Sequence, residues 1–154
     1  MPPAIGEADA SLYRCQGDPG SAAWVSWNIE NKTRFNGQFG ELLTRRDGDR
    51  AVVRMHPHPG LANVTNNLHG GAVMTFIDIA LFVGARVLGV QSAPEGVTVD
   101  LNVQFVAGAD IANPVDTILQ ITRETGRLLF LRGTAEQAGA AVASFIGIVR
   151  KPPL

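Results

Sequence analysis

The chain has 154 residues and a formal net charge of −1; 45% of its residues are hydrophobic and 18% are charged. This length allows one domain with a substantial core and is too short for two. The near-neutral charge gives no reason to expect nucleic acid as a partner, and the single cysteine, Cys15, cannot form an internal disulfide, so we expect a cytoplasmic protein.

The first part of the chain, residues 1–36, is expected to be an N-terminal extension ahead of a main domain over residues 37–154. Within the extension, residues 21–27 (SAAWVSW) follow Asp18-Pro19-Gly20 and predict a short helix. The extension is therefore expected to be an addition to the main domain.

A hairpin is predicted next, because the pair Asp47-Gly48 is typical of a two-residue turn between strands. Its two strands are predicted over residues 40–46 and 51–56. His56 and His58 do not indicate a metal site, since no cysteine cluster or helical histidine pair accompanies them. We expect no metal.

One long helix is predicted from about residue 71 to residue 88. Residues 71–85 read GAVMTFIDIALFVGA, and Asp78 is the only ionisable group among them. A helix that is apolar all round must be buried on every side, so its carboxylate has to be paired, protonated or used. A structural role, in which Asp78 pairs with Arg86 or with a backbone donor, is the alternative to a catalytic role. These two charges also argue against a membrane span.

Beyond Pro94 the pattern changes to strand spacing, with apolar and polar residues alternating strictly over residues 97–105. Three more strands are predicted over residues 115–124, 127–137 and 140–150, separated by turn residues. One helix too apolar for the surface and about six strands have a simple arrangement, in which an antiparallel sheet curls around the helix. This α+β arrangement is the hotdog fold.

Three blocks of the sequence resemble the phenylacetate-pathway, or PaaI-like, branch of the hotdog acyl-CoA thioesterases. They are residues 63–71 (NVTNNLHGG), Asp78, and residues 96–103 (GVTVDLNV). The resemblance runs from about residue 40 to residue 150. It implies an enzyme that hydrolyses an acyl-CoA to the free acid and CoA, without a metal or redox cofactor, since coenzyme A enters only as part of the substrate.

The resemblance also implies roles for five residues. Asp78 matches the carboxylate that acts as general base or nucleophile, and both possibilities stay open. Gly70 matches the residue whose backbone N–H, at the helix N-terminus, binds the oxyanion. Asn63 matches a residue that holds the carbonyl or the attacking water, and Thr98 one that orients the carboxylate or the water. His69 is expected to support the oxyanion loop, with a simple helix cap as the alternative.

Other residues are expected to contact the substrate. Gly71 completes the glycine pair that brings backbone N–H groups close to a ligand. Arg127 and Arg132 are available for the CoA phosphates, although an arginine on a strand is usually only solvated. Asn66 replaces a glycine that the family usually has, and asparagine is the best substitute if a positive φ is required there.

Three aromatic residues of the extension, Trp24, Trp27 and Phe35, are candidates to roof the acyl pocket. The alternative is that they pack against the sheet.

Gly70 and Asp78 cannot serve one substrate from the same helix. Eight residues at 1.5 Å each separate them by roughly 12 Å, whereas both groups must lie ~3 Å from the reacting carbonyl. The sequence therefore predicts a homo-oligomer, at least a dimer and by expectation a tetramer, whose sites combine two subunits. The rival functions are a hotdog dehydratase or hydratase on acyl thioesters, and an acyl-CoA-binding hotdog without turnover.

Overall fold

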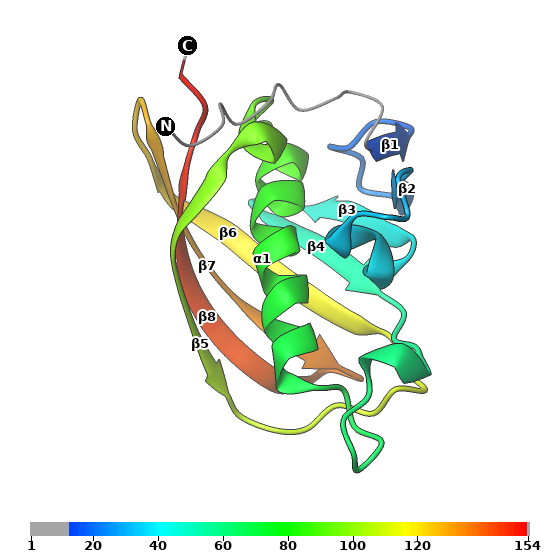
Figure 1. Cartoon of the computed structure of the whole chain (residues 1–154). Coiled ribbons are helices and arrows are strands. Elements are labelled where there is room, and N and C mark those ends of the chain that lie inside the picture. Colours follow the sequence, from blue (N-terminus) through cyan, green and yellow to red (C-terminus); the bar gives the residue numbers. More distant parts are fainter. Residues whose placement is uncertain (1–12, 154) are drawn as a thin grey trace, which may run out of the picture.

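The computed structural model describes residues 13–153. One long helix, α1 (Gly70–Val87), lies against an antiparallel sheet that curls around it (Figure 1). The eight strands have the spatial order β1-β2-β3-β4-β6-β7-β8-β5. They are β1 (Tyr13–Gln16), β2 (Val25–Ile29), β3 (Leu42–Asp47), β4 (Arg50–Met55), β5 (Val97–Phe105), β6 (Val115–Glu124), β7 (Leu128–Gln137) and β8 (Ala140–Arg150). Three short 3₁₀ turns complete the fold: η1 (Phe35–Phe39), η2 (Pro59–Leu61) and η3 (Ala93–Glu95).

The predicted α+β hotdog fold is confirmed, with eight strands in place of about six. Both additional strands come from the N-terminal extension, where a short helix is expected over residues 21–27. That expectation is wrong, because Asp18 accepts a hydrogen bond from the Gly20 N–H and forms a turn in place of a helix cap. Strand β2 then pairs with β3, and Trp27 is 2% exposed and stacks on Tyr13 at 5.1 Å.

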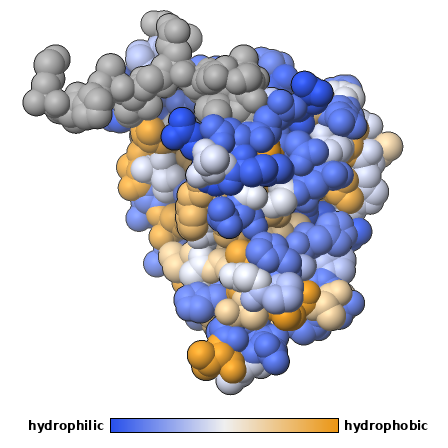
Figure 2. Space-filling view, turned by 45° about the vertical axis from the view of Figure 1, so that its right-hand side comes forward, coloured by the Kyte–Doolittle hydropathy of each residue, from blue (hydrophilic) through white to orange (hydrophobic). Residues whose placement is uncertain are grey.

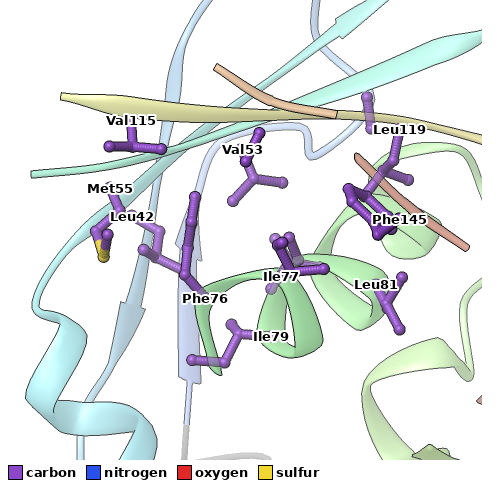
Figure 3. Close-up of a cluster of buried hydrophobic side chains, with 14 of the residues drawn as sticks. Leu42, Val53, Met55, Phe76, Ile77, Ile79, Leu81, Val115, Leu119 and Phe145 are labelled. Atoms are coloured by element: carbon purple, nitrogen blue, oxygen red, sulfur yellow. The ribbon is translucent and has the colours of Figure 1, made fainter. Parts of the chain in front are cut away.

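The core lies between one side of α1 and the inner face of the sheet. Figure 3 shows Phe76, Ile77 and Leu81 of the helix among strand side chains such as Val53 and Leu119. The helix is long and apolar enough to cross a membrane by length and composition, but 61% of it is buried inside the fold. It is therefore the core helix of the domain.

The expectation that α1 is buried on every side is wrong for a single chain. One stripe of the helix is open or half-buried, and Met74 on it is 38% exposed. Asp78 lies in the same stripe and is half-buried, followed by Phe82 and Arg86. We call this stripe, Met74 to Arg86, the open face of α1. It places the carboxylate at the surface of one chain.

Strand β5 is the edge of the sheet next to this open face, since among residues 13–153 it pairs only with β8. Figure 2 shows hydrophobic residues reaching the surface in separate patches, several of them at the lower end of the molecule, where α1 begins in Figure 1. Exposed apolar side chains in the segments around the helix start are Val64, Phe105 and Val106. An exposed strand edge with apolar side chains is a ready surface for pairing.

Candidate active site

The loop that leads into α1 is organised by Asn63. Its Oδ1 accepts hydrogen bonds from the backbone N–H groups of Thr65, at 2.9 Å, and Asn67, at 3.0 Å, and from the Thr65 hydroxyl at 2.8 Å. The Asn63 N–H donates to the Asn67 carbonyl at 2.7 Å. Within residues 13–153 the Asn63 Nδ2 has no acceptor, so the side chain shapes the loop and still offers a donor.

Asn66 adopts a left-handed backbone conformation, with φ of 62°. This is the conformation considered in the sequence analysis for a position where the family usually has glycine. A left-handed backbone favours glycine, and asparagine is among the residues that tolerate it best. The departure from the usual glycine is therefore accommodated, and the turn is kept.

A second segment holds this loop in place. The Leu68 N–H donates to the Ala109 carbonyl at 2.8 Å, and Asn67 forms a bridge to Asp110. Gln137, from the turn end of β7, accepts from the Asp110 N–H and donates to its carbonyl, both at 2.9 Å. No local sequence pattern predicts this clamp, because its three segments are far apart in the chain.

His69 caps the N-terminus of α1, which is the simpler of the two roles expected for it. Its Nδ1 accepts from the Gly71 N–H at 2.8 Å, and its carbonyl accepts from the Val73 N–H at 3.0 Å. Because Nδ1 is an acceptor, the ring proton of the neutral imidazole is on Nε2. Among the described residues the Gly70 N–H has no acceptor, and it points out of the positive end of an 18-residue helix.

Phe105 lies over Gly70. A Cβ built on Gly70 would be 3.6 Å from the Cε1 and Cζ atoms of the Phe105 ring, which is ordinary contact. The free N–H of Gly70 is thus at the edge of an apolar surface, where hydrogen bonds to a developing charge are stronger than in water. The sequence pattern indicates a strand residue at Phe105 but not this contact.

Asp78 and Thr98 are brought together directly. The Thr98 hydroxyl donates a hydrogen bond to Oδ1 of Asp78 at 2.5 Å. Within residues 13–153 no ion pair joins Asp78 to Arg86, the structural alternative, and Oδ2 of Asp78 has no partner. One oxygen of the carboxylate is therefore fixed, and the other is open.

A β-bulge in β5 presents Thr98 to the helix. The pairing with β8 shifts between Thr98, opposite Val149, and Asp100, opposite Ile148, so Val99 is the extra residue. Strict alternation predicts Val99 on the same face as Leu101, yet Val99 is 54% exposed. The bulge reverses the faces, so that Thr98 and Leu101 both face α1.

Cys15 lacks the features of a reactive thiol. Burial is the main cause that raises the pKa of its thiol, with Asp18 adding to the effect and Arg86 opposing it. A thiol that stays protonated is a weak nucleophile.

The two candidate phosphate ligands lie apart from the helix start. Arg127 is in the turn between β6 and β7, at the end of the molecule where α1 ends (Figure 1). Arg132 is on the outer face of the sheet, opposite Gln120 and Ile146 on the neighbouring strands. The cavities that Arg132 lines, on the strands of the sheet, include neither Gly70 nor Asp78.

The aromatic residues of the extension separate. Trp27 is in the core, and Trp24 packs on the outer face of the sheet, with the guanidinium groups of Arg45 and Arg54 at 5.2 Å and 4.5 Å from its ring centre. The expectation that the two tryptophans cover the pocket is therefore wrong, and the alternative, packing against the sheet, describes them. Phe35 does line a cavity at the helix start, together with His69 and Gly71.

The family model of the thioesterase superfamily matches residues 65–146, more than half of the chain. The chain belongs to the thioesterase superfamily. Gly70, Asp78 and Thr98 fall inside the matched range, whereas Asn63 and the N-terminal extension lie before it. A search of curated proteins found no match.

Several solved structures share the fold. The PaaI protein of Escherichia coli, from the phenylacetic acid degradation operon, is 18% identical with a TM-score of 0.60 and covers 70% of this chain and 75% of its own. A hypothetical thioesterase of Streptococcus pneumoniae TIGR4, solved with coenzyme A, is 18% identical with a TM-score of 0.60. The match covers 69% of the present chain and 82% of the Streptococcus pneumoniae chain. A Streptococcus mutans UA159 protein bound to acetyl-CoA is 12% identical with a TM-score of 0.59. The match covers 68% of the present chain and 82% of the Streptococcus mutans chain.

Proposed function

We propose that this protein hydrolyses acyl-CoA thioesters to the free acid and CoA, at sites that two copies of the chain build together. The observation that carries the proposal is the hydrogen bond from Thr98 to Asp78 on the open face of α1, in a chain whose helix N-terminus offers the free Gly70 N–H. An oriented carboxylate and an oxyanion donor are the two groups that hydrolysis of a thioester requires. Solved structural relatives that contain coenzyme A or acetyl-CoA support this substrate class.

In the proposed mechanism the thioester carbonyl oxygen accepts the Gly70 N–H. As the carbonyl carbon becomes tetrahedral, negative charge collects on that oxygen, and the dipole of α1 stabilises it. The free Nδ2 of Asn63 serves as a second donor, to this oxygen or to the attacking water. His69 contributes by capping the Gly71 N–H, which leaves the Gly70 N–H for the substrate.

Asp78 acts through Oδ2, because Thr98 holds Oδ1. As a general base, it takes a proton from water while the water oxygen bonds to the carbonyl carbon; the C–S bond then breaks, and the CoA thiolate regains a proton. As a nucleophile, its oxygen bonds to the carbonyl carbon and displaces the thiolate, and water hydrolyses the resulting anhydride. Both routes give the same products.

The proposal needs a second copy of the chain because Gly70 and Asp78 are roughly 12 Å apart along one helix. We infer that Gly70 and Asn63 of one copy meet Asp78 and Thr98 of another. The unpaired β5 edge and the adjacent open face of α1 support this, since both would be covered in such a dimer.

Higher assembly and location belong to the same proposal. A tetramer would join two dimers through the outer face of the sheet, where Ile146 is exposed between Arg132 and Asn102. Such packing is also what would bring Arg127 or Arg132 of one copy to a CoA bound by another. With one cysteine, the chain suits a reducing compartment, and we place the activity in the cytoplasm.

The direct test is release of free thiol from a panel of acyl-CoAs. A thioesterase liberates CoA in step with acid, and the Asp78→Asn variant does not. An altered acyl group without free thiol would instead identify a dehydratase or hydratase. Saturable acyl-CoA binding without any product would identify a binding protein, and either result would overturn the proposal.

A further inference from the structure

A cavity of about 470 Å³ lies beside the first turn of α1. We call it the side pocket. Residues on its lining that matter here are Phe35, Phe39, His58, Leu61, His69 and Ala72. Its volume falls within the range of about 300–1,000 Å³ that is usual for ligand sites, and four of these six side chains are apolar.

The side pocket adjoins the proposed oxyanion donor. His69 and Gly71, which both line it, flank Gly70 in the chain. If the carbonyl oxygen of a thioester accepts a hydrogen bond from the Gly70 N–H, its acyl substituent can therefore reach the side pocket. Phe105 covers the other side of Gly70, where a Cβ would meet its ring at 3.6 Å.

One wall of the side pocket is formed by η1, which lies more than 30 residues before α1 in the sequence. Phe39 is buried and anchors this turn, while Phe35 is 68% exposed at the rim and meets Phe39 edge-on, with ring centres 6.1 Å apart. A large aromatic ring left this exposed next to a cavity has apolar area available for a ligand.

His58 fixes this wall to the loop that precedes the helix. Its Nδ1 accepts from the Gly60 N–H at 3.1 Å, so its proton is on Nε2, which donates to the Gln38 carbonyl at 2.7 Å. Both ring nitrogens are used, and η1 is tied to η2. The wall is thus a fixed part of the pocket and not a loose terminal segment.

We propose that η1, through Phe35, is the specificity-determining wall of the acyl site and that the side pocket takes bulky apolar acyl groups in preference to short ones. This inference rests on the proposed function. An acetyl group would leave most of the pocket unfilled, whereas a bulky group gains contacts with Phe35, Leu61 and Ala72. Residues 35–39 precede the range that the superfamily model matches, so the superfamily match alone does not imply this wall.

The test compares Phe35→Ala with Trp24→Ala, each as the full chain. Trp24 is a matched control because it is an aromatic residue of the same extension that lies on the outer face of the sheet. The measured quantity is the ratio of kcat/KM for cyclohexanecarbonyl-CoA to kcat/KM for acetyl-CoA. We expect Phe35→Ala to lower this ratio by about 10-fold or more, since loss of contacts in an apolar pocket typically changes discrimination by about 10- to 200-fold. Trp24→Ala should leave the ratio within about twofold.

A second variant narrows the pocket from the helix side. Thr75 lines the side pocket, and Thr75→Leu places a larger side chain there. It should also lower the ratio, by excluding the bulky group. Equal losses for both substrates with Phe35→Ala, or an unchanged ratio with both variants, would overturn the assignment.

Binding separates this inference from the proposed function. If the wild-type chain releases no CoA from any substrate, calorimetric titration of Asp78→Asn, with and without Phe35→Ala, by the same two acyl-CoAs still tests the pocket. A loss of preference for the bulky group supports the wall, and an unchanged preference overturns it. A dimer weakened by Phe35→Ala, measured by sedimentation, together with an unchanged acyl preference would show Phe35 to be a subunit contact and would also overturn it.

Discussion

Replacing Thr98 with valine tests whether the Thr98–Asp78 hydrogen bond supports catalysis. Valine has nearly the shape of threonine and suits a strand, and Thr98 is exposed, so we expect the fold to be kept, with the free energy of unfolding lowered by no more than the energy of the lost hydrogen bond, about 1–2 kcal/mol. What is lost is a 2.5 Å hydrogen bond to a carboxylate.

Hydrogen bonds to charged groups contribute about 1.5–3 kcal/mol, and partial exposure of this pair lowers the expected value to about 1–2 kcal/mol. That energy corresponds to a loss of roughly 5- to 30-fold in kcat. The assay is initial-rate thiol release from an acyl-CoA that the wild-type chain hydrolyses, with Thr98→Ser as the control that keeps the hydroxyl.

Thr98→Ser should retain most of the activity, and thermal unfolding should show all three proteins equally folded. Wild-type kcat in a folded Thr98→Val variant would refute the reasoning, because Asp78 would then be oriented without Thr98.

Asp78→Asn should lower kcat by about 10²–10⁴-fold in the thiol-release assay while gel filtration shows unchanged assembly, since the amide packs like the carboxylate but cannot accept a proton; near wild-type turnover would remove Asp78 from the mechanism. Deleting residues 1–20 removes β1 and the stacking of Tyr13 on Trp27, so the melting temperature should fall by about 2–6 °C; an unchanged value would mean that β1 adds no stability. The pKa of Asp110 is lowered, chiefly by the Asn113 side chain and then by backbone N–H groups, so its contribution to stability is present above the ordinary aspartate pKa and is lost as pH falls through the lowered one. The melting-temperature difference between wild type and Asp110→Ala should therefore be largest at neutral pH and shrink on acidification, and a difference independent of pH would contradict this linkage.

Local patterns in the sequence predict much of the fold. The bounds predicted for β5, β6 and β8 agree with the structure, because alternating residues and turn dipeptides encode strands locally. The signal before β2 was misleading, since its conformation depends on pairing with Leu42 and Leu43 of β3. Pairing of this kind is tertiary, and a window of the sequence does not contain it.

The candidate site likewise combines features that local sequence patterns predict with features that depend on tertiary contacts. The sequence predicts a helix start within one residue of the observed Gly70, and it singles out the loop residue Asn66 and the carboxylate of Asp78. The bulge at Val99 could not be read from strict alternation, although it decides that Thr98 faces Asp78. Likewise, the position of Phe105 over Gly70 depends on how the end of β5 passes the helix start.

Subunit complementation tests the central claim, a hydrolytic site shared by two copies, most directly. Asp78→Asn lacks the base, and Gly70→Val places branched carbons in front of the oxyanion donor, toward Phe105. Each variant alone should be inactive in thiol release. In a heterodimer isolated by two affinity tags, one site would combine intact Gly70 with intact Asp78 and the other would carry both lesions. We predict recovery of about half of the wild-type rate per heterodimer. An inactive heterodimer, verified as assembled and folded, would contradict the claim and assign each site to a single chain.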